Sequence, residues 1–350
     1  MADKFRVALS GDFRKADGSP TYPDFDLAPL RAAQGVEAVF LDAANPLRAD
    51  QLEDFDALIL LAHRFAAESV PKSGRLAIIA RFGVGYDTVD VEACTKAGIA
   101  LAITPDGVRR PVAISILTLM LALTGKLMVK DRLTREAAAG FAKRSDHMGV
   151  GLVGRTLGSL GLGNIGAEAF RMAKPFDMRF IAHDPFADKA VAAELGVELV
   201  GLDDVFRQAD IVSVNCPLTA QTRHLVNAER LALMKPTAYL INTARGPIVD
   251  QKALTKALQE RRIAGAGLDV LEQEPPDADD PILKLGNVLL SPHALCWTDQ
   301  CFAGNGAADV KAVLDVQHGR APRGIVNRAV LETDAWKARL NDFGRRFGGQ

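Results

Sequence analysis

A short glycine-rich run in the middle of the chain has the spacing G-x-G-x-x-G of a phosphate-binding turn. It reads Gly161, Leu162, Gly163, Asn164, Ile165, Gly166, between a strand-like segment, TLGSL, and a helix-like segment, AEAFRMAKPF. In such turns the first glycine permits the bend, the second lets backbone N–H groups approach a pyrophosphate, and the third allows close helix packing. The run therefore predicts a dinucleotide at a helix N-terminus, with a purely structural turn as the alternative.

An acidic residue follows this run at the distance that a dinucleotide site requires. Asp184 closes the next apolar segment, IAHDP, 18 residues after Gly166. A carboxylate there accepts hydrogen bonds from the ribose hydroxyls of NAD and repels the 2′-phosphate of NADP. No arginine follows closely, and the nearest downstream cation is Lys189. We therefore expect NAD as the cofactor.

Three further polar positions follow apolar strand-like segments, where parallel sheets place their ligands. Arg245 follows AYLINT and precedes Gly-Pro, and its guanidinium suits the geometry of a carboxylate. His293, in SPHALCWT, can exchange a proton with a substrate oxygen. Either Glu272 or Glu274 can pair with that histidine, and residue types alone leave both open. With a nicotinamide cofactor, this set could hold an anionic substrate, polarise its carbonyl and move a proton.

The composition excludes several classes of protein. Lys and Arg number 42 and Asp and Glu 43, so a net charge of −1 argues against nucleic acid or an acidic membrane surface as the main partner. The cysteines fit no zinc or redox motif, and we expect no metal site: Cys94, Cys216, Cys296, Cys301. We interpret five of the histidines as structural: His63, His147, His183, His224, His318. No secretory signal or span of roughly 20 apolar residues is visible, so we expect a cytoplasmic protein without a membrane partner.

Short apolar runs alternate with helix-like stretches over most of the chain. Such alternation predicts parallel sheets covered by helices on both faces. We expect strands at 5–10, 38–41, 57–61 and 76–80 in a first unit, and at 154–161, 178–184, 210–215, 238–243 and 264–270 in a second. The predicted fold is α/β, with two Rossmann-like, doubly wound parallel-sheet domains.

The expected domains are interleaved along the chain. The helix-like stretch 307–319 is expected to return to the first unit, which makes that domain discontinuous. The predicted substrate domain is 1–105 plus 299–350, and the predicted NAD-binding domain is 106–298. Residues 112–128 form a helix candidate that is too apolar for a solvated face. We therefore predict that this helix packs between the subunits of a homodimer.

Several motifs, in order along most of the chain, resemble those of D-isomer-specific 2-hydroxyacid dehydrogenases. They are RFGVGYDTVD (81–90), GRTLGSLGLGNIG (154–166), NCPLTAQTRHLV (215–226), LMKPTAYLINTARGPIVD (233–250), GAGLDVLEQEP (265–275) and SPH (291–293). The resemblance implies an NAD-dependent enzyme that interconverts a D-2-hydroxy acid and its 2-oxo acid by hydride transfer. It also implies that Arg245 binds the substrate carboxylate and carbonyl, that His293 is the acid/base, and that Glu274, rather than Glu272, pairs with it.

The resemblance further implies contacts to substrate and cofactor. The backbone N–H groups of Val84 and Gly85 would hold the substrate carboxylate. Arg81, just before them, is either a further substrate contact or a structural residue. The nicotinamide end would meet Thr243, Ala244 and Asp269, and the adenosine end would meet Cys216, Pro217 and Thr222.

Some positions depart from the family's usual sequence. Trp297 stands in a segment that usually holds small residues, and it either lines the substrate pocket or packs between the domains. Arg109 and Arg110 either bind a second anionic group or are solvated or at a subunit interface. Ile114 stands where many members carry Glu. Two alternative functions remain: a dinucleotide-sensing binding module of the corepressor type, and a short phosphoglycerate-type dehydrogenase.

Overall fold

A computed structural model describes residues 4–348 of the 350-residue chain. Within these residues the chain divides into two compact units. Unit 1 runs as far as Val108 and resumes at Trp297, and unit 2 is Arg109–Cys296. The sequence-based boundaries, after residues 105 and 298, lie within three residues of these divisions.

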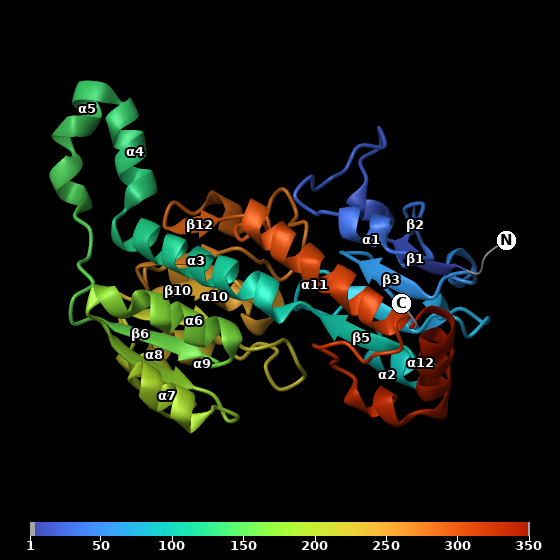
Figure 1. Cartoon of the computed structure of the whole chain (residues 1–350). Helices are drawn as coiled ribbons and strands as arrows, with labels where there is room; N and C mark the ends of the chain where they lie inside the picture. The colour runs from blue at the N-terminus through green and yellow to red at the C-terminus, as the bar shows by residue number, and fades with distance from the viewer. Residues whose placement is uncertain (1–3, 349–350) are drawn as a thin grey trace. The chain divides into compact units, whose positions relative to one another are not determined.

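A five-stranded parallel sheet forms the centre of unit 1 (Figure 1). Its strands are β1 (Phe5–Leu9), β2 (Val36–Phe40), β3 (Ala57–Leu60), β4 (Ile78–Arg81) and β5 (Ala100–Ile103). They are ordered β2-β1-β3-β4-β5. All four residues of β3 are buried, because helices and loops cover both faces of a parallel sheet, and such strands read as continuous apolar runs.

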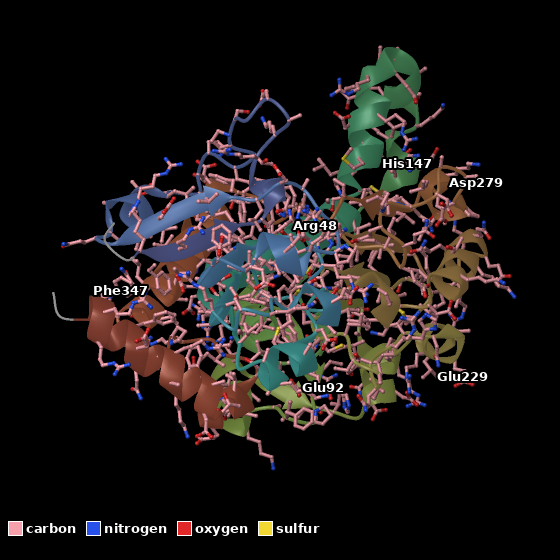
Figure 2. The ribbon with its side chains drawn as sticks, turned by 90° about the vertical axis from the view of Figure 1, so that its right-hand side faces the viewer. Arg48, Glu92, His147, Glu229, Asp279 and Phe347 are labelled. Carbon is pink, nitrogen blue, oxygen red and sulfur yellow. The ribbon has the colours of Figure 1, made fainter. Side chains whose placement is uncertain are left out.

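The helices of unit 1 come from both ends of the chain. They are α1 (Ala28–Ala32), α2 (Val91–Lys96), α11 (Asp299–Gln317) and α12 (Asp334–Phe347), with 3₁₀ helices η1 (Gly11–Phe13), η2 (Ala49–Gln51), η3 (Ala67–Ser69) and η8 (Arg328–Glu332). The ring of Phe5, in β1, lies 5.0 Å from that of Phe343 and 6.0 Å from that of Phe347, which Figure 2 labels at the end of α12. Val313 of α11 is buried in the same core cluster. The unit is therefore discontinuous in sequence, as expected.

Unit 2 contains a seven-stranded parallel sheet of order β12-β11-β10-β9-β6-β7-β8. Its strands are β6 (Thr156–Leu160), β7 (Arg179–His183), β8 (Val197–Leu199), β9 (Ile211–Val214), β10 (Tyr239–Asn242), β11 (Gly265–Leu268) and β12 (Val288–Leu290). From β6 the chain adds β7 and β8 on one side, and it then crosses to β9 on the other side. This reversal of winding beside β6 leaves a crevice at the carboxyl ends of the strands, where ligands of such sheets bind.

Helices cover the sheet of unit 2. They are α4 (Leu127–Arg135), α5 (Ala137–Ala142), α6 (Asn164–Ala173), α7 (Lys189–Leu195), α8 (Leu202–Gln208), α9 (Ala228–Leu233) and α10 (Gln251–Gln259), with η4 (Arg144–His147), η5 (Lys174–Phe176), η6 (Gly246–Ile248) and η7 (Pro281–Lys284). Side chains of Asp188, Asn227 and Asp250 accept backbone N–H groups at the starts of α7, α9 and α10. Such caps satisfy N–H groups that have no partner within the helix.

Helix α3 (Pro105–Thr124) begins in unit 1 and continues into unit 2. By length and composition alone it could cross a membrane. Its apolar residues Ala113, Ile116, Leu119, Met120 and Leu123 are nevertheless buried in a core cluster of unit 2. The helix is therefore a core helix, and its apolar character does not by itself require a partner subunit. Beyond it, α4 and α5 extend away from the sheet (Figure 1).

Candidate dinucleotide site and catalytic residues

The glycine run forms the turn between β6 and α6. Gly161 has φ +106°, and a Cβ there would lie 3.0 Å from the backbone of Asn215. A Cβ on Gly166 would lie 2.6 Å from the carbonyl oxygen of Gly161. The fold itself therefore requires glycine at these two positions. At Gly163 no atom of the described residues lies within 4 Å of a Cβ, so this glycine leaves room for a ligand at the start of α6.

Asp184 follows β7 and contacts the glycine turn directly. Its Oδ2 accepts the N–H of Leu162 at 2.8 Å, and its Oδ1 accepts the N–H of Phe186 at 2.8 Å. The side chain is partly exposed. Because each carboxylate oxygen has two acceptor sites, Asp184 can still accept a hydroxyl group from a ligand.

The loop after β9 lies beside the same turn. Burial, with a smaller contribution from the charge of Asp184, raises the pKa of the Cys216 thiol to about 11. Cys216 is therefore a neutral packing residue rather than a nucleophile. The hydroxyl of Thr222 donates to the carbonyl of Pro217 at 2.6 Å, which fixes the shape of this loop.

The turn after β10 carries three predicted site residues, Thr243, Ala244 and Arg245. Asn242, 1% exposed, holds this turn: its Nδ2 donates to the carbonyl of Arg245 at 2.9 Å, and its Oδ1 accepts the N–H of Ala244 at 3.0 Å. The Oγ1 of Thr243 is buried, and no described residue gives it a hydrogen-bond partner. A buried hydroxyl with no protein partner fits the expected contact with a bound cofactor.

Arg245 lies next to the segment that carries Glu274. A Cβ on Gly246 would overlap the backbone of Leu271, so only glycine allows these two segments to approach so closely. The Nη1 of Arg245 donates to the carbonyl of Ala244 at 2.7 Å. Its charge is also close enough to help lower the pKa of Glu274.

Glu274 and His293 are joined by a hydrogen bond. His293 Nδ1 lies 2.8 Å from Glu274 Oε2, and the N–H of Leu271 donates to Glu274 Oε1 at 2.9 Å. Burial alone would raise the pKa of Glu274. The hydrogen bonds from His293 and Leu271, with the charges of His293 and Arg245, outweigh burial and leave the pKa below its ordinary value. Glu274 is therefore an ionised partner for the imidazole.

Asp269, at the end of β11, holds the backbone around His293. Its carbonyl accepts the N–H of His293 at 2.7 Å, and its Oδ1 accepts the hydroxyl of Ser291 at 2.6 Å and the N–H of Ala294 at 3.0 Å. The side chain is 3% exposed. The sequence did not indicate this role, and it missed Ser291 and Asn242 altogether. His293 has φ +54°, a conformation that this set of bonds stabilises.

The alternative acid, Glu272, has a different partner. Its Oε1 lies 2.6 Å from His224 Nε2, and its Oε2 accepts the N–H of Gln251 at 3.2 Å. The choice that the residue types left open therefore falls on Glu274 as the carboxylate beside His293.

The predicted carboxylate loop, Val84 and Gly85, belongs to unit 1. Thr104 holds the residue before it from both sides: the N–H of Gly83 donates to Thr104 Oγ1 at 2.8 Å, and the N–H of Thr104 donates to the carbonyl of Gly83 at 2.9 Å. Arg81 donates to the carbonyl of Phe82, and its guanidinium lies against Gly83. The start of the loop is therefore fixed by its own unit.

Arg81 also faces the interior of unit 1. Burial raises the pKa of Asp309 well above its ordinary value, and the charge of Arg81 partly offsets that rise. These contacts give Arg81 structural partners, which supports the structural alternative for this residue.

The residues that depart from the family pattern have clear local contacts. The ring of Trp297, 49% exposed, lies edge-on at 5.3 Å from Tyr22 and at 5.6 Å from Phe302, all in unit 1. Arg110 forms an ion pair with Glu168 at 3.1 Å. Arg110 is thus engaged within unit 2, while Arg109 is exposed.

Comparison with known proteins adds independent information. The family described as D-isomer specific 2-hydroxyacid dehydrogenase, NAD binding domain, matches residues 117–294. A glyoxylate reductase of Korarchaeum cryptofilum is 40% identical over 285 residues, which are 81% of this chain and 86% of the relative. A D-3-phosphoglycerate dehydrogenase of Methanocaldococcus jannaschii is 37% identical over 280 residues, 79% of this chain and 53% of that protein. The crystal structure of a glyoxylate reductase from Paecilomyes thermophila superposes with a TM-score of 0.75 at 29% identity and covers 90% of this chain and 96% of its own.

Proposed function

The chain belongs to the D-isomer specific 2-hydroxyacid dehydrogenase family, and from this premise we propose that Arg245, Glu274 and His293 carry its reaction. The enzyme is an NAD-dependent oxidoreductase that interconverts a 2-hydroxy acid and its 2-oxo acid. The observation that supports the residue roles most directly is the 2.8 Å contact between His293 Nδ1 and Glu274 Oε2.

His293 has one ring nitrogen left for the substrate, because Glu274 holds Nδ1. In reduction, Nε2 of the protonated imidazole donates its proton to the 2-oxo oxygen. In oxidation, Nε2 of the neutral imidazole takes the hydroxyl proton. The ionised Glu274 stabilises the imidazolium and fixes the orientation of the ring. Bound NAD supplies the chemistry of accepting or donating the hydride.

Arg245 binds the anionic end of the substrate. Its planar guanidinium presents several N–H donors, which suit a carboxylate and can also polarise a 2-oxo oxygen. Asn242 fixes the backbone of the turn from which the arginine projects. Removing Arg245 is therefore expected to weaken both substrate binding and turnover.

The cofactor contacts follow the carboxyl ends of β6, β7, β9, β10 and β11. The backbone N–H groups at Gly163, Asn164 and Ile165 lie at the start of α6 and are the proposed donors to the pyrophosphate. Asp184 accepts the ribose hydroxyls. The adenosine end is assigned to Cys216, Pro217 and Thr222, and the nicotinamide end to Thr243, Ala244 and Asp269.

Two residues of unit 1 complete the proposed substrate contacts. The N–H groups of Val84 and Gly85 are assigned to the substrate carboxylate on the family resemblance, and Thr104 and Arg81 fix the residue before them. A substitution of Thr104 by Val removes the hydroxyl that holds Gly83. It is expected to raise KM for the 2-oxo acid more than it lowers kcat.

We propose a small 2-oxo acid as substrate, with glyoxylate as the first candidate. Relatives named glyoxylate reductase support this choice. The phosphoglycerate-type alternative retains support from the M. jannaschii relative. The binding-module alternative has the same site residues and differs only in lacking turnover.

Initial rates with NADH, and separately with NADPH, test these assignments against glyoxylate, hydroxypyruvate, branched, aromatic and phosphorylated 2-oxo acids. The proposal predicts the highest kcat/KM for glyoxylate or hydroxypyruvate with NADH. Preference for NADPH would contradict the role of Asp184. Preference for a phosphorylated acid would favour the phosphoglycerate type, and NADH binding without turnover would favour the binding module.

We also propose a homodimer and a cytoplasmic location. The segment 127–148, from the start of α4 to the residue after η4, exposes large apolar side chains that a lone subunit would leave in water: Leu127 58%, Met128 53%, Phe141 54%, Met148 73%. The spacing of the four cysteines along the chain fits no disulfide framework, which suits a reducing compartment. Cell fractionation with an antibody against the chain tests the location, and recovery in a membrane or secreted fraction would contradict it.

A further inference from the structure

A second histidine–carboxylate pair lies in unit 2, and its acid is only two residues from Glu274 along the chain. His224 Nε2 is 2.6 Å from Glu272 Oε1, and the two side chains are 40% and 29% exposed. Arg223 Nη2 lies farther from the same oxygen, at 3.8 Å. His224 therefore makes the short contact to Glu272. Neither residue of this pair takes part in the substrate and cofactor contacts assigned above.

The acid of this pair is also tied to the start of α10. Glu272 Oε2 accepts the N–H of Gln251 at 3.2 Å, and the N–H of Glu272 donates to Gln251 Oε1 at 2.8 Å. The other side-chain atom of this glutamine, Nε2, donates to Asp280 Oδ2 at 2.7 Å. Glu272 is thus held by both its backbone and its side chain, and its Oε1 remains for His224.

The histidine of this pair is tied to the segment that follows Arg245. The N–H of His224 donates to the carbonyl of Pro247 at 2.9 Å. Two residues later, the N–H of Val226 donates to the carbonyl of Ile248 at 3.0 Å, and both of these side chains are fully buried. His224 has φ +50°, a conformation that persists where such surrounding bonds maintain it.

The pair therefore joins three segments: 224–226, 246–250 and 271–274. The second begins next to Arg245, and the third carries Glu274, whose Oε1 accepts the N–H of Leu271 at 2.9 Å. The backbone of Gly246 packs directly against Leu271. Any shift of Glu272 along these segments would therefore also move the donor to Glu274. Since partly exposed ion pairs contribute little to overall stability, the main effect of this pair is on local geometry.

We propose that His224 and Glu272 are positioning residues for the reaction: they hold the segment of Glu274 against the turn of Arg245, so that Glu274 meets Nδ1 of His293. This inference rests on the proposed function, because it acts through Glu274. A displacement of about 1 Å at a reacting group can cost about 100-fold in rate, so a modest shift of this segment has a measurable effect.

Steady-state reduction by NADH of the preferred 2-oxo acid tests the proposal with three variants. Glu272→Ala and His224→Ala should each lower kcat about tenfold, while NADH affinity and the melting temperature stay at the values of the wild type. His224→Gln places an amide nitrogen at a similar reach, where it can donate to Glu272 Oε1. It should recover most of the kcat that His224→Ala loses.

A double variant shows whether the pair acts through Glu274. In the background of Glu274→Gln, the imidazole has already lost its ionised partner, so the position of residue 274 matters less. Adding Glu272→Ala to that background should therefore lower kcat by less than about twofold further, in contrast to its tenfold effect alone. A full tenfold further loss would mean that Glu272 acts independently of Glu274, and it would overturn the proposal.

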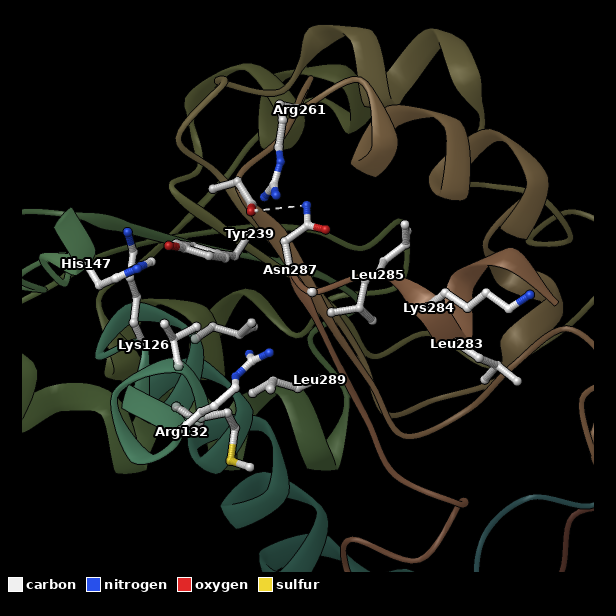
Figure 3. Close-up of a pocket in the computed structure, with 17 residues that line it drawn as sticks. Lys126, Arg132, His147, Tyr239, Arg261, Leu283, Lys284, Leu285, Asn287 and Leu289 are labelled. Carbon is white, nitrogen blue, oxygen red and sulfur yellow. Dashed lines mark hydrogen bonds between the residues drawn. The ribbon is translucent and has the colours of Figure 1, made fainter. Parts of the chain in front are cut away.

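Two matched controls separate this effect from general damage. Glu198→Ala removes a carboxylate whose 2.7 Å ion pair with Arg179 lies at the far edge of the sheet. Arg261→Ala matches His224→Ala in backbone conformation, because Arg261 has φ +54°. Figure 3 shows Arg261 near Asn287, at the amino ends of the strands, whereas the catalytic residues follow the carboxyl ends. Both controls should leave kcat within about twofold.

The outcomes distinguish failure of this proposal from failure of the proposed function. Unchanged kcat in Glu272→Ala and His224→Ala, with a loss in Glu274→Gln, would overturn the positioning role alone. Unchanged kcat in Glu274→Gln as well would overturn the assignment of Glu274 and, with it, this inference. A loss in the two controls equal to that in Glu272→Ala, or a melting temperature that falls together with kcat, would indicate general destabilisation and also contradict the proposal.

Discussion

At the scale of single residues, the proposed chemistry depends on which atoms already have partners. Glu274 occupies Nδ1 of His293, so a proton can pass only through Nε2. Residue types and spacing were enough to predict Arg245, His293 and a nearby acid. They could not predict that Asp269 and Asn242 fix the two turns, because such bonds depend on the conformation of the turns they cap. Residue types alone left Glu272 open, the family resemblance favoured Glu274, and the structure pairs Glu272 with His224 and Glu274 with His293.

The substitution Glu274→Gln keeps the shape of the side chain and removes its charge. We expect kcat to fall about 10- to 100-fold, because the imidazolium loses its ionised partner. The lowered pKa of Glu274 means that its contribution to stability is present above its ordinary pKa and is lost as pH falls through the lowered value. Urea unfolding of both proteins across acidic pH should show their difference shrinking as pH falls. A variant with unchanged rates and an unchanged pH profile would contradict the pairing.

At the scale of elements, the central strands and one edge strand, β2, could be predicted, and the other three edge strands were missed. All nine expected strands are present. The three that were missed, β5, β8 and β12, are each the last strand at an edge of a sheet. β8 and β12 are three residues long and partly exposed, so they lack the longer apolar run that marks a central strand. β5 is an apolar and mostly buried run of four residues, as long as the predicted β3, so its signal was present in the sequence and was missed. The glycine turn could be predicted because the strand before it and the helix after it are its immediate neighbours in the sequence.

Two glycines of that turn separate folding from cofactor binding. Gly161→Ala places a Cβ against backbone at a left-handed φ and should destabilise the fold by about 1–3 kcal/mol. In Gly163→Ala, the added methyl group has no described atom within 4 Å, so the melting temperature of this variant should match that of the wild type. Its affinity for NAD should nevertheless fall about tenfold, because the methyl group enters the space proposed for the pyrophosphate. Thermal melts and NADH fluorescence titrations measure both. Unchanged NAD affinity in Gly163→Ala would contradict the proposal that the pyrophosphate binds at this turn.

At the scale of the whole molecule, the chain leaves unit 1 through α3 and returns to it through α11. The C-terminal helices complete the core of unit 1, so unit 1 is discontinuous in sequence, whereas unit 2 is the single continuous segment between its two parts. The return was predictable because residues 307–319 have helical spacing. The role of α3 was not, because an apolar helix in a core and an apolar helix between subunits have the same composition. Its buried residues belong to unit 2, and the exposed apolar residues beyond it are the stronger indication of a partner.

The homodimer can be tested with two matched phenylalanines of unit 2. Phe141, on α5, is 54% exposed and lies in the projecting segment, whereas Phe186, 94% exposed, lies in the loop after β7. By light scattering at micromolar concentration we expect twice the chain mass of 37.5 kDa for the wild type and for Phe186→Glu. Phe141→Glu should be monomeric, because a charge at an apolar interface is costly to bury. A monomeric wild type, or equal behaviour of the two variants, would contradict this interface.

The central claim is that His293, oriented by Glu274, moves the proton when this dehydrogenase reduces a 2-oxo acid. The most direct test compares the wild type with His293→Gln, using NADH oxidation by glyoxylate and NADH binding by fluorescence. The account predicts measurable turnover by the wild type, a loss of about 10²- to 10⁴-fold in kcat for the variant, and unchanged NADH affinity. A variant that keeps its rate would place the acid/base at another residue.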